Sequence, residues 1–257
     1  MPVRLTPRCF EILRLIAAAR WLTTDQIRRR FFPAVAIDAV RKRLRVLASG
    51  RYLCRVQLSR MHFAYWTLGR EGKRVLERAG VENLMIHRDL PKQLEHFTAI
   101  NDVRIAAELS VTLSYFFSCW ELQKTGWSEL IIPDALFAFE GRTFAVEFDT
   151  GTESTKLFAK TKMPAYRSGL SGLALSGVLI ISDRESRLDS LANSIGSCDS
   201  LAVYTTIGQL RDQGLRASIF WSGGDSKTLN GTRTSLLELS CGGDKSSRRP
   251  ALYSNSL

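Results

Sequence analysis

The chain has 257 residues and a formal net charge of +11, and hydrophobic residues make up 45% of it. This composition is typical of a globular protein with one large or two smaller domains, and it excludes a disordered chain. No apolar run is long enough to span a bilayer, and the first residues lack the apolar core of a secretory signal. We therefore expect a cytoplasmic protein with no membrane partner.

The positive charge is concentrated in the first third of the chain. Residues 1–90 carry 19 Lys and Arg against 7 Asp and Glu, whereas the remaining residues carry 17 against 18. A positive field confined to one part of a protein is typical of phosphate-backbone binders. An anionic membrane would also attract it, but there is no basic amphipathic helix with a large aromatic face. The charge therefore favours double-stranded DNA as the partner.

The cysteines are widely scattered, and the three histidines do not cluster with them. No pair has the spacing of a metal site, so we expect reduced, structural cysteines and no zinc. They are Cys9, Cys54, Cys119, Cys198 and Cys241.

Three helices are predicted in the first 50 residues. Thr6 and Pro7 begin the first, a turn at Arg20–Thr23 follows, and Thr24 caps a second helix at Asp25–Phe32. The third covers Ala36–Gly50, with Gly50 as a left-handed C-cap. One face of this third helix is an apolar stripe formed by Ile37, Val40, Leu44 and Leu47. Its opposite face is basic. The alternative interpretation is an ordinary amphipathic helix whose basic face is only solvated.

Two strands, Tyr52–Leu58 and Phe63–Leu68, are typical of a β-hairpin, and a helix at Glu71–Ala79 closes the segment. This order over residues 1–80 resembles winged helix-turn-helix DNA-binding domains. The resemblance implies that the third helix enters the major groove and that the hairpin tip reaches the adjacent DNA. The residues expected to contact DNA are Arg28, Arg29, Arg30, Arg41, Lys42, Arg45, Arg60 and His62. The alternative is a winged helix used for protein contacts.

We predict a linker at residues 81–92, an α/β domain at residues 93–221 and a mostly flexible tail at residues 222–257. A helix at Gln93–Leu109 opens the domain. The predicted strands are Tyr115–Leu122, Leu130–Phe139, Thr143–Phe148 and Gly177–Ser182, with a helix at Ser154–Lys162 before the last of them. The elements predicted after these are Arg184–Ile195, Leu201–Thr205 and Ile207–Gln213.

The hairpin in the middle of this domain brings acidic residues together. A two-residue turn at Glu140-Gly141 places residue 139 opposite 142, and therefore Asp134 opposite Glu147. Asp149 shares a face with Glu147 because side chains two apart in a strand point the same way. Facing carboxylates need a divalent cation, a Lys or Arg partner, or protonation of one of them. In the alternative register the acids lie solvated at strand ends.

Pro133-Asp134 followed by Glu147-Phe148-Asp149 resembles the restriction-endonuclease-like PD-(D/E)xK fold, whose element order is αβββαβ. The resemblance implies an Mg²⁺ site at Asp134, Glu147 and Asp149 with a catalytic lysine. The chain departs from the pattern because Asp149 stands at the lysine position. Lys156, Lys160 or Lys162 of the following helix would replace that lysine, with Lys162 as the candidate.

A narrower resemblance covers most of the chain. The run Glu147–Glu153 (EFDTGTE), with His96 upstream and Lys162 and Tyr166 downstream, resembles the replication-relaxation family. That family occurs on plasmids and integrative elements and is linked to plasmid replication and DNA relaxation. Tyr166 suggests a DNA-linked tyrosine, although a packing role is favoured because no activating base can be placed beside it.

We therefore expect a mobile-element DNA-binding protein of α/β class, with an N-terminal winged helix-turn-helix and a nuclease-like domain that nicks DNA with Mg²⁺. The alternative is a non-catalytic regulator or antitoxin-like repressor whose degenerate nuclease-like domain mediates dimerisation or partner binding. Expected protein partners are a second copy of the chain and other mobile-element or replication proteins.

Overall fold

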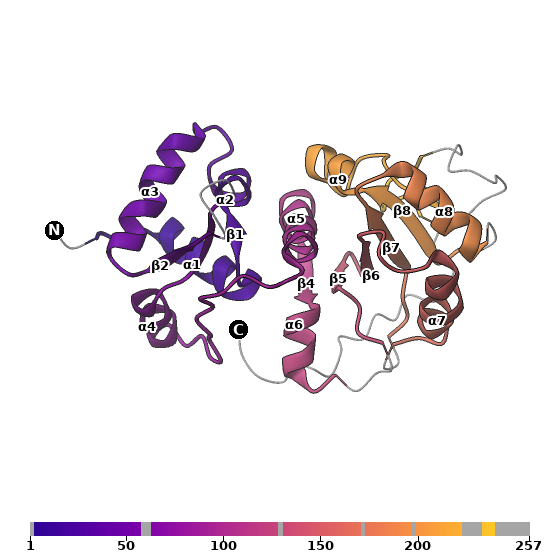
Figure 1. Ribbon diagram of the computed structural model, residues 1–257, viewed down its shortest axis with the longest axis horizontal. Coiled ribbons are helices and arrows are strands. Elements are labelled where there is room, and N and C mark those ends of the chain that lie inside the picture. Colours follow the sequence, from indigo (N-terminus) through magenta and orange to yellow (C-terminus); the bar gives the residue numbers. More distant parts are fainter. Residues whose placement is uncertain are drawn as a thin grey trace. The chain divides into compact units, whose positions relative to one another are not determined.

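The computed structural model describes residues 3–57, 63–127, 131–170, 173–196, 199–222 and 233–239, and it has the mixed α/β class expected from the sequence (Figure 1). The chain divides into two compact units, with residues up to Asn101 in the first and residues from Asp102 in the second. This boundary lies within a helix, later in the chain than the linker predicted at residues 81–92. None of the described helices is long and apolar enough to cross a membrane.

The first unit contains the predicted order of three helices, a hairpin and a fourth helix. Its elements are α1 (Pro7–Ala19), β1 (Leu22–Thr23), α2 (Thr24–Phe31), α3 (Ile37–Ser49), β2 (Leu53–Val56), β3 (Tyr65–Leu68) and α4 (Arg70–Arg78). The three strands form an antiparallel sheet in the order β1-β3-β2. The hairpin tip, which includes Arg60 and His62, lies outside the described residues.

Three local predictions for this unit were wrong. Leu22 and Thr23, assigned to a turn, pair with Trp66 and Tyr65 of β3. Thr23 rather than Thr24 caps α2, because its side chain and that of Gln26 form a reciprocal capping box.

Gly50 was also predicted wrongly, since its φ is −80° and not left-handed. The positive φ falls one residue later, at Arg51 (61°). The requirement for glycine at position 50 is instead close packing, because a Cβ there would lie 2.8 Å from the ring of Tyr52.

Helix α5 (Leu94–Ser110) crosses the boundary between the units and matches the predicted helix. The second unit continues with β4 (Leu113–Ser118), α6 (Cys119–Leu122), β5 (Ala135–Phe139), β6 (Arg142–Asp149), α7 (Thr155–Arg167), β7 (Gly177–Ser182), α8 (Glu185–Ile195), β8 (Ala202–Thr206), α9 (Ile207–Gln213) and β9 (Trp221–Ser222). A short 3₁₀ turn at Gln123–Thr125 follows α6.

The strands of the second unit form one sheet in the order β4-β5-β6-β7-β8-β9. Strand β5 is antiparallel to both of its neighbours, β4 and β6, whereas β6, β7 and β8 run parallel, so β6 lies where the two arrangements meet. Helices α7 and α8 contribute apolar side chains to one core together with β5 to β8. Outside this core, four buried phenylalanine rings stack on one another. They are Phe116, Phe137, Phe139 and Phe144.

Several predicted boundaries in this unit change. The strand predicted to reach Leu122 ends at Ser118, because Ser118 and Glu121 form a capping box that starts α6. The strand predicted at Leu130–Phe139 begins only at Ala135. Helix α7 continues past Pro164 to Arg167, rather than ending at Lys162.

Residues 233–239, which the sequence placed in a mostly flexible tail, form a packed segment. Thr234 forms a β-bridge with Phe220, and Leu236 is fully buried. Arg142 donates hydrogen bonds to the carbonyl oxygens of Leu236 and Leu237, both at 2.8 Å. This part of the tail therefore belongs to the core of the second unit.

Candidate functional site

The β5–β6 hairpin has the predicted turn and register. Glu140 and Gly141 both have positive φ, 49° and 75°, as a two-residue hairpin turn requires, and Phe139 pairs with Arg142. The pairing runs to Ala135 opposite Val146, so Asp134 lies one residue before the strand. The Asp134 carboxylate accepts a hydrogen bond of 2.8 Å from the backbone N–H of Phe148, which holds it beside the end of β6.

We call Asp134, Glu147 and Asp149 the acidic cluster. Glu147 lies at its centre and has 2% of its surface exposed. Its Oε2 accepts a hydrogen bond of 2.8 Å from Lys162 Nζ, and its Oε1 accepts one from the hydroxyl of Tyr166. Lys162 Nζ also lies 3.2 Å from Oε2 of Glu153, in the segment between β6 and α7. The structure therefore brings Glu147 and Lys162 together, two of the residues predicted to carry the chemistry.

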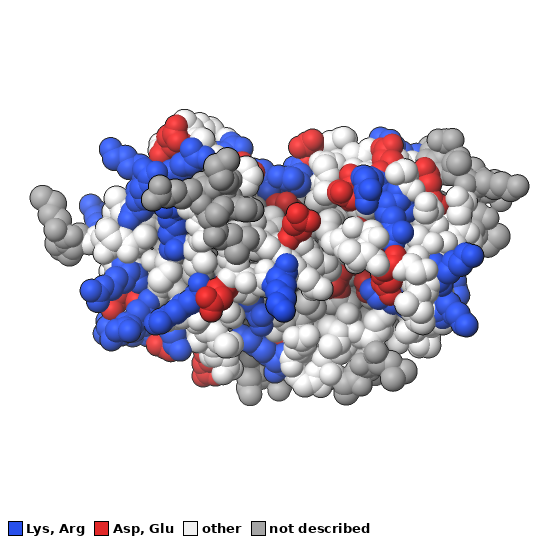
Figure 2. All heavy atoms as spheres, viewed as in Figure 1, with Lys and Arg blue, Asp and Glu red and all other residues white. Residues whose placement is uncertain are grey.

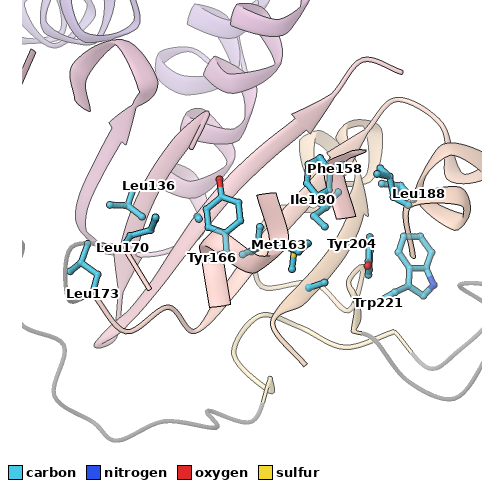
Figure 3. Packing of buried hydrophobic residues seen from close by; sticks show 14 of the residues in the cluster. Leu136, Phe158, Met163, Tyr166, Leu170, Leu173, Ile180, Leu188, Tyr204 and Trp221 are labelled. Carbon is cyan, nitrogen blue, oxygen red and sulfur yellow. The ribbon is translucent and has the colours of Figure 1, made fainter. Parts of the chain in front are cut away.

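Helix α7 places these partners by its periodicity. Phe158, Lys162 and Tyr166 are four residues apart and therefore share one face of the helix. Phe158 and Tyr166 are buried, and Figure 3 shows the Tyr166 ring among Leu136, Leu170 and Met163. Tyr166 thus packs in the core, with only its hydroxyl directed to a polar partner.

Burial and charge shift the proton affinities in this cluster. Burial, with repulsion from Asp134, raises the pKa of Glu147 to about 7, although Lys162 and Tyr166 oppose the change. Burial and the negative charge of Glu147 also raise the pKa of Tyr166 well above its ordinary value. For Lys162, burial acts to lower the pKa, but the attraction of Glu147 and Glu153 outweighs it and raises the pKa overall. Lys162 therefore stays a cation, and Tyr166 is a poor nucleophile because it is buried and protonated.

Asp149 has a different cationic partner. It is 7% exposed, and its carboxylate accepts hydrogen bonds from Arg187 of α8, the shorter at 2.5 Å, and from the N–H of Gly151 at 2.8 Å. Arg187 also donates to the backbone carbonyl oxygen of Glu153. The third predicted acid is thus neutralised by a residue that sequence reasoning missed, because no local signal links position 149 to position 187.

The carboxylates expected to hold magnesium are held by cationic side chains and a backbone N–H in the structure. Within the described ranges, no group of three or more His, Cys, Asp or Glu side chains is arranged to hold a metal ion. Lys162 and Arg187 supply the positive charge that facing carboxylates need, and the raised pKa of Glu147 adds partial protonation. Two of the three compensations considered from the sequence, a cationic partner and protonation of a carboxyl group, are therefore supplied by the chain itself.

The basic face of the first unit is carried by α3. Val40, Leu44 and Leu47 are buried, as predicted, and Ile37 of the same stripe is partly buried. Arg41, Lys42 and Arg45 are exposed. Arg41 forms a 2.8 Å ion pair with Asp38, one turn earlier in the helix. Lys42 and Arg45 form no ion pair with any residue that the structure describes. Figure 2 shows Lys and Arg side chains at several places on the visible surface of the first unit, where they are more prominent than Asp and Glu.

The arginines of α2 are more restrained. Arg28 and Arg29 both pair with Asp25, each at 3.0 Å. Burial acts to raise the pKa of Asp25, but the hydrogen bonds from these two arginines lower it overall. The Arg30 guanidinium lies over the ring of Phe31, 5.2 Å from its centroid, and all three arginines are partly buried. Of these two helices, α3 therefore carries the cations that are more available to a partner.

His96, which the resemblance placed with Lys162 and Tyr166, lies in the first half of α5 and belongs to the first unit. Its ring is 6.3 Å from that of Phe97, in an edge-to-face arrangement. The acidic cluster belongs to the second unit.

The replication-relaxation family model matches residues 13–172, more than half of the chain. The matched range includes α3, the β5–β6 hairpin, Lys162 and Tyr166. No curated protein and no solved structure matches the chain.

Proposed function

The chain belongs to the replication-relaxation family, which suggests a role in the replication or relaxation of mobile elements, and we propose that it performs this role by binding double-stranded DNA through the outward face of α3. The single observation that carries the proposal is that Lys42 and Arg45 are exposed on a helix whose other face is buried. Cations in this position attract phosphates over a distance and can also reach the edges of guanine in the major groove.

The neighbouring residues support the same assignment. The first 90 residues hold the whole basic excess of the chain. Arg43 faces inward, with hydrogen bonds of 2.9 Å to the carbonyl oxygen of Arg4 and to the Cys9 sulfur, so it fixes α3 rather than serving a partner. The predicted contacts of Arg28, Arg29 and Arg30 with phosphates remain part of the proposal as positioning contacts.

The proposal is tested with a charge-matched pair of variants. Lys42→Gln/Arg45→Gln removes two exposed cations from α3, and Arg74→Gln/Arg78→Gln removes two exposed cations from α4. Binding to a fluorescent duplex is measured by anisotropy at several salt concentrations. We expect the α3 variant to lower the slope of log K against log salt by roughly 2, because each phosphate that is no longer neutralised reduces it by about 0.9. Equal decreases in the two variants would show that charge alone, and not α3, governs binding.

Magnesium-dependent nicking stays a prediction from the resemblance to PD-(D/E)xK nucleases. Supercoiled plasmid is incubated with Mg²⁺ and the wild type, Asp134→Asn or Glu147→Gln, and the nicked form is quantified on a gel. Nicking by the wild type that is abolished in both variants would support an endonuclease. Duplex binding without nicking under any divalent metal would favour the alternative, a non-catalytic regulator whose second unit mediates dimerisation or partner binding.

A further inference from the structure

Lys162 is shared by two carboxylates that differ in burial. The Glu147 side chain is 3% exposed, lies within the core and bonds Lys162 at 2.8 Å. The Glu153 side chain is 33% exposed and makes the longer contact, at 3.2 Å. The Lys162 side chain is itself 30% exposed, so solvent reaches part of it, and its Nζ also lies 5.1 Å from the centroid of the Phe158 ring. Of its two partners, Glu153 is therefore the one that an anion from outside can replace.

The backbone around Glu153 is anchored independently of this contact. Arg187 donates to the Glu153 carbonyl oxygen and to the Asp149 carboxylate, and the N–H of Gly151 also donates to Asp149. Rotation of the Glu153 side chain would therefore free Lys162 without opening the segment that joins β6 to α7. A second cation lies beside this segment, because Arg184 Nη2 is 3.0 Å from where a Cβ on Gly151 would stand.

We propose that Lys162 is a phosphate-binding residue of the second unit, and that the carboxylate of Glu153 occupies the place of a phosphodiester oxygen until DNA binds. An ammonium group bonds a phosphate oxygen and a carboxylate oxygen alike, since both are anionic acceptors. Exchange between them keeps Lys162 neutralised and leaves its contact with Glu147 intact. The inference rests on the proposed DNA binding, and it adds a contact in the second unit that an acidic side chain regulates.

The test compares two single-charge variants of the full chain. Glu153→Gln removes the competing carboxylate with little change in shape. Glu140→Gln removes a more exposed charge from the hairpin turn, where Glu140 faces Arg216 at 3.8 Å. Both variants are expected to melt close to the wild type, because exposed ion pairs contribute little to stability. Binding of a fluorescent duplex is titrated at several salt concentrations.

We expect Glu153→Gln to bind the duplex roughly two- to fivefold more tightly than the wild type, the factor corresponding to removal of a competing exposed ion pair. The slope of log K against log salt should stay close to that of the wild type, because Lys162 contacts the same phosphate in both complexes. Glu140→Gln should tighten binding by less than Glu153→Gln. Equal behaviour of the two variants would overturn the inference.

Repeating the titration in the Lys42→Gln/Arg45→Gln background separates this inference from the function proposed above. If Glu153→Gln also tightens binding in that background, the second unit has a phosphate contact that does not depend on α3. Normal binding by the wild type with no tightening by Glu153→Gln refutes this inference alone. Absence of duplex binding in the wild type and in Glu153→Gln refutes both proposals.

Discussion

Replacement of Glu147 by Gln is the most informative single change in the acidic cluster. The side chain is enclosed between β6 and α7, where Lys162 and Tyr166 donate to its two oxygens. Glutamine keeps the shape and an acceptor oxygen but cannot ionise. The variant therefore removes the cost of the buried charge while it preserves most of the packing.

The size of the effect follows from the proton affinity. Burial and the nearby Asp134 raise the pKa of Glu147 from 4.5 to about 7. Between these two values the folded protein holds a proton that the unfolded chain has released, so stability falls as the pH rises. At about 1.4 kcal/mol for each pH unit, the wild type should lose about 3 kcal/mol across this window through Glu147. Glu147→Gln lacks this decrease.

The measurement is urea unfolding of wild type and Glu147→Gln at pH 5, 6, 7 and 8. The difference in unfolding free energy should move in favour of the variant as the pH rises from 5 to 7, and should then level off. Parallel pH curves would show that Glu147 keeps an ordinary pKa. A difference that moves in favour of the wild type would show that attraction to Lys162 outweighs burial, and it would refute the reasoning.

Two further changes test the contacts around the site. Arg187→Met leaves the buried Asp149 without its cation and should lower the free energy of unfolding by about 3 kcal/mol. The control, Arg184→Met, removes a largely exposed cation and should lower it by under about 1 kcal/mol. Both values are measured by urea unfolding. Similar midpoints would mean that Arg187 is dispensable. Gly141→Ala should destabilise by about 1 kcal/mol because φ is 75° there, but Gly208→Ala, in open space within α9, should be neutral or stabilising by thermal melting. A harmless Gly141→Ala would argue against the turn.

The hairpin that carries the acids could be predicted because its determinants are local. The pair Glu140-Gly141 specifies a two-residue turn, and the turn then sets every pairing back to Ala135 opposite Val146. The helical spacing in α3 likewise identified the buried stripe. Two capping boxes, Thr23 with Gln26 and Ser118 with Glu121, were equally visible in the sequence as Ser or Thr followed three residues later by Gln or Glu. They show where the starts of helices α2 and α6 could have been located.

The partners of the acids could not be predicted from local patterns, because they depend on packing between distant elements. Arg187 reaches Asp149 across 38 residues. Lys162 was named only through the family resemblance, because local spacing does not show which side of α7 faces the sheet. Alternation along β6 placed Glu147 and Asp149 on one face, but it could not show that each has a separate cation. The chemistry of the cluster is therefore set by α7 and α8, which pack against one another and the sheet.

The order of strands also determines how the second unit folds. Strands β5 and β6 join through two residues, whereas the parallel neighbours β6 and β7 pair Phe144 with Gly177, 33 positions later. Local contacts form faster than distant ones because less chain entropy is lost in closing them, so the antiparallel hairpin should assemble first. Before α7 packs against that hairpin, the Glu147 carboxylate should still be hydrated. Its burial should therefore be a late step in folding.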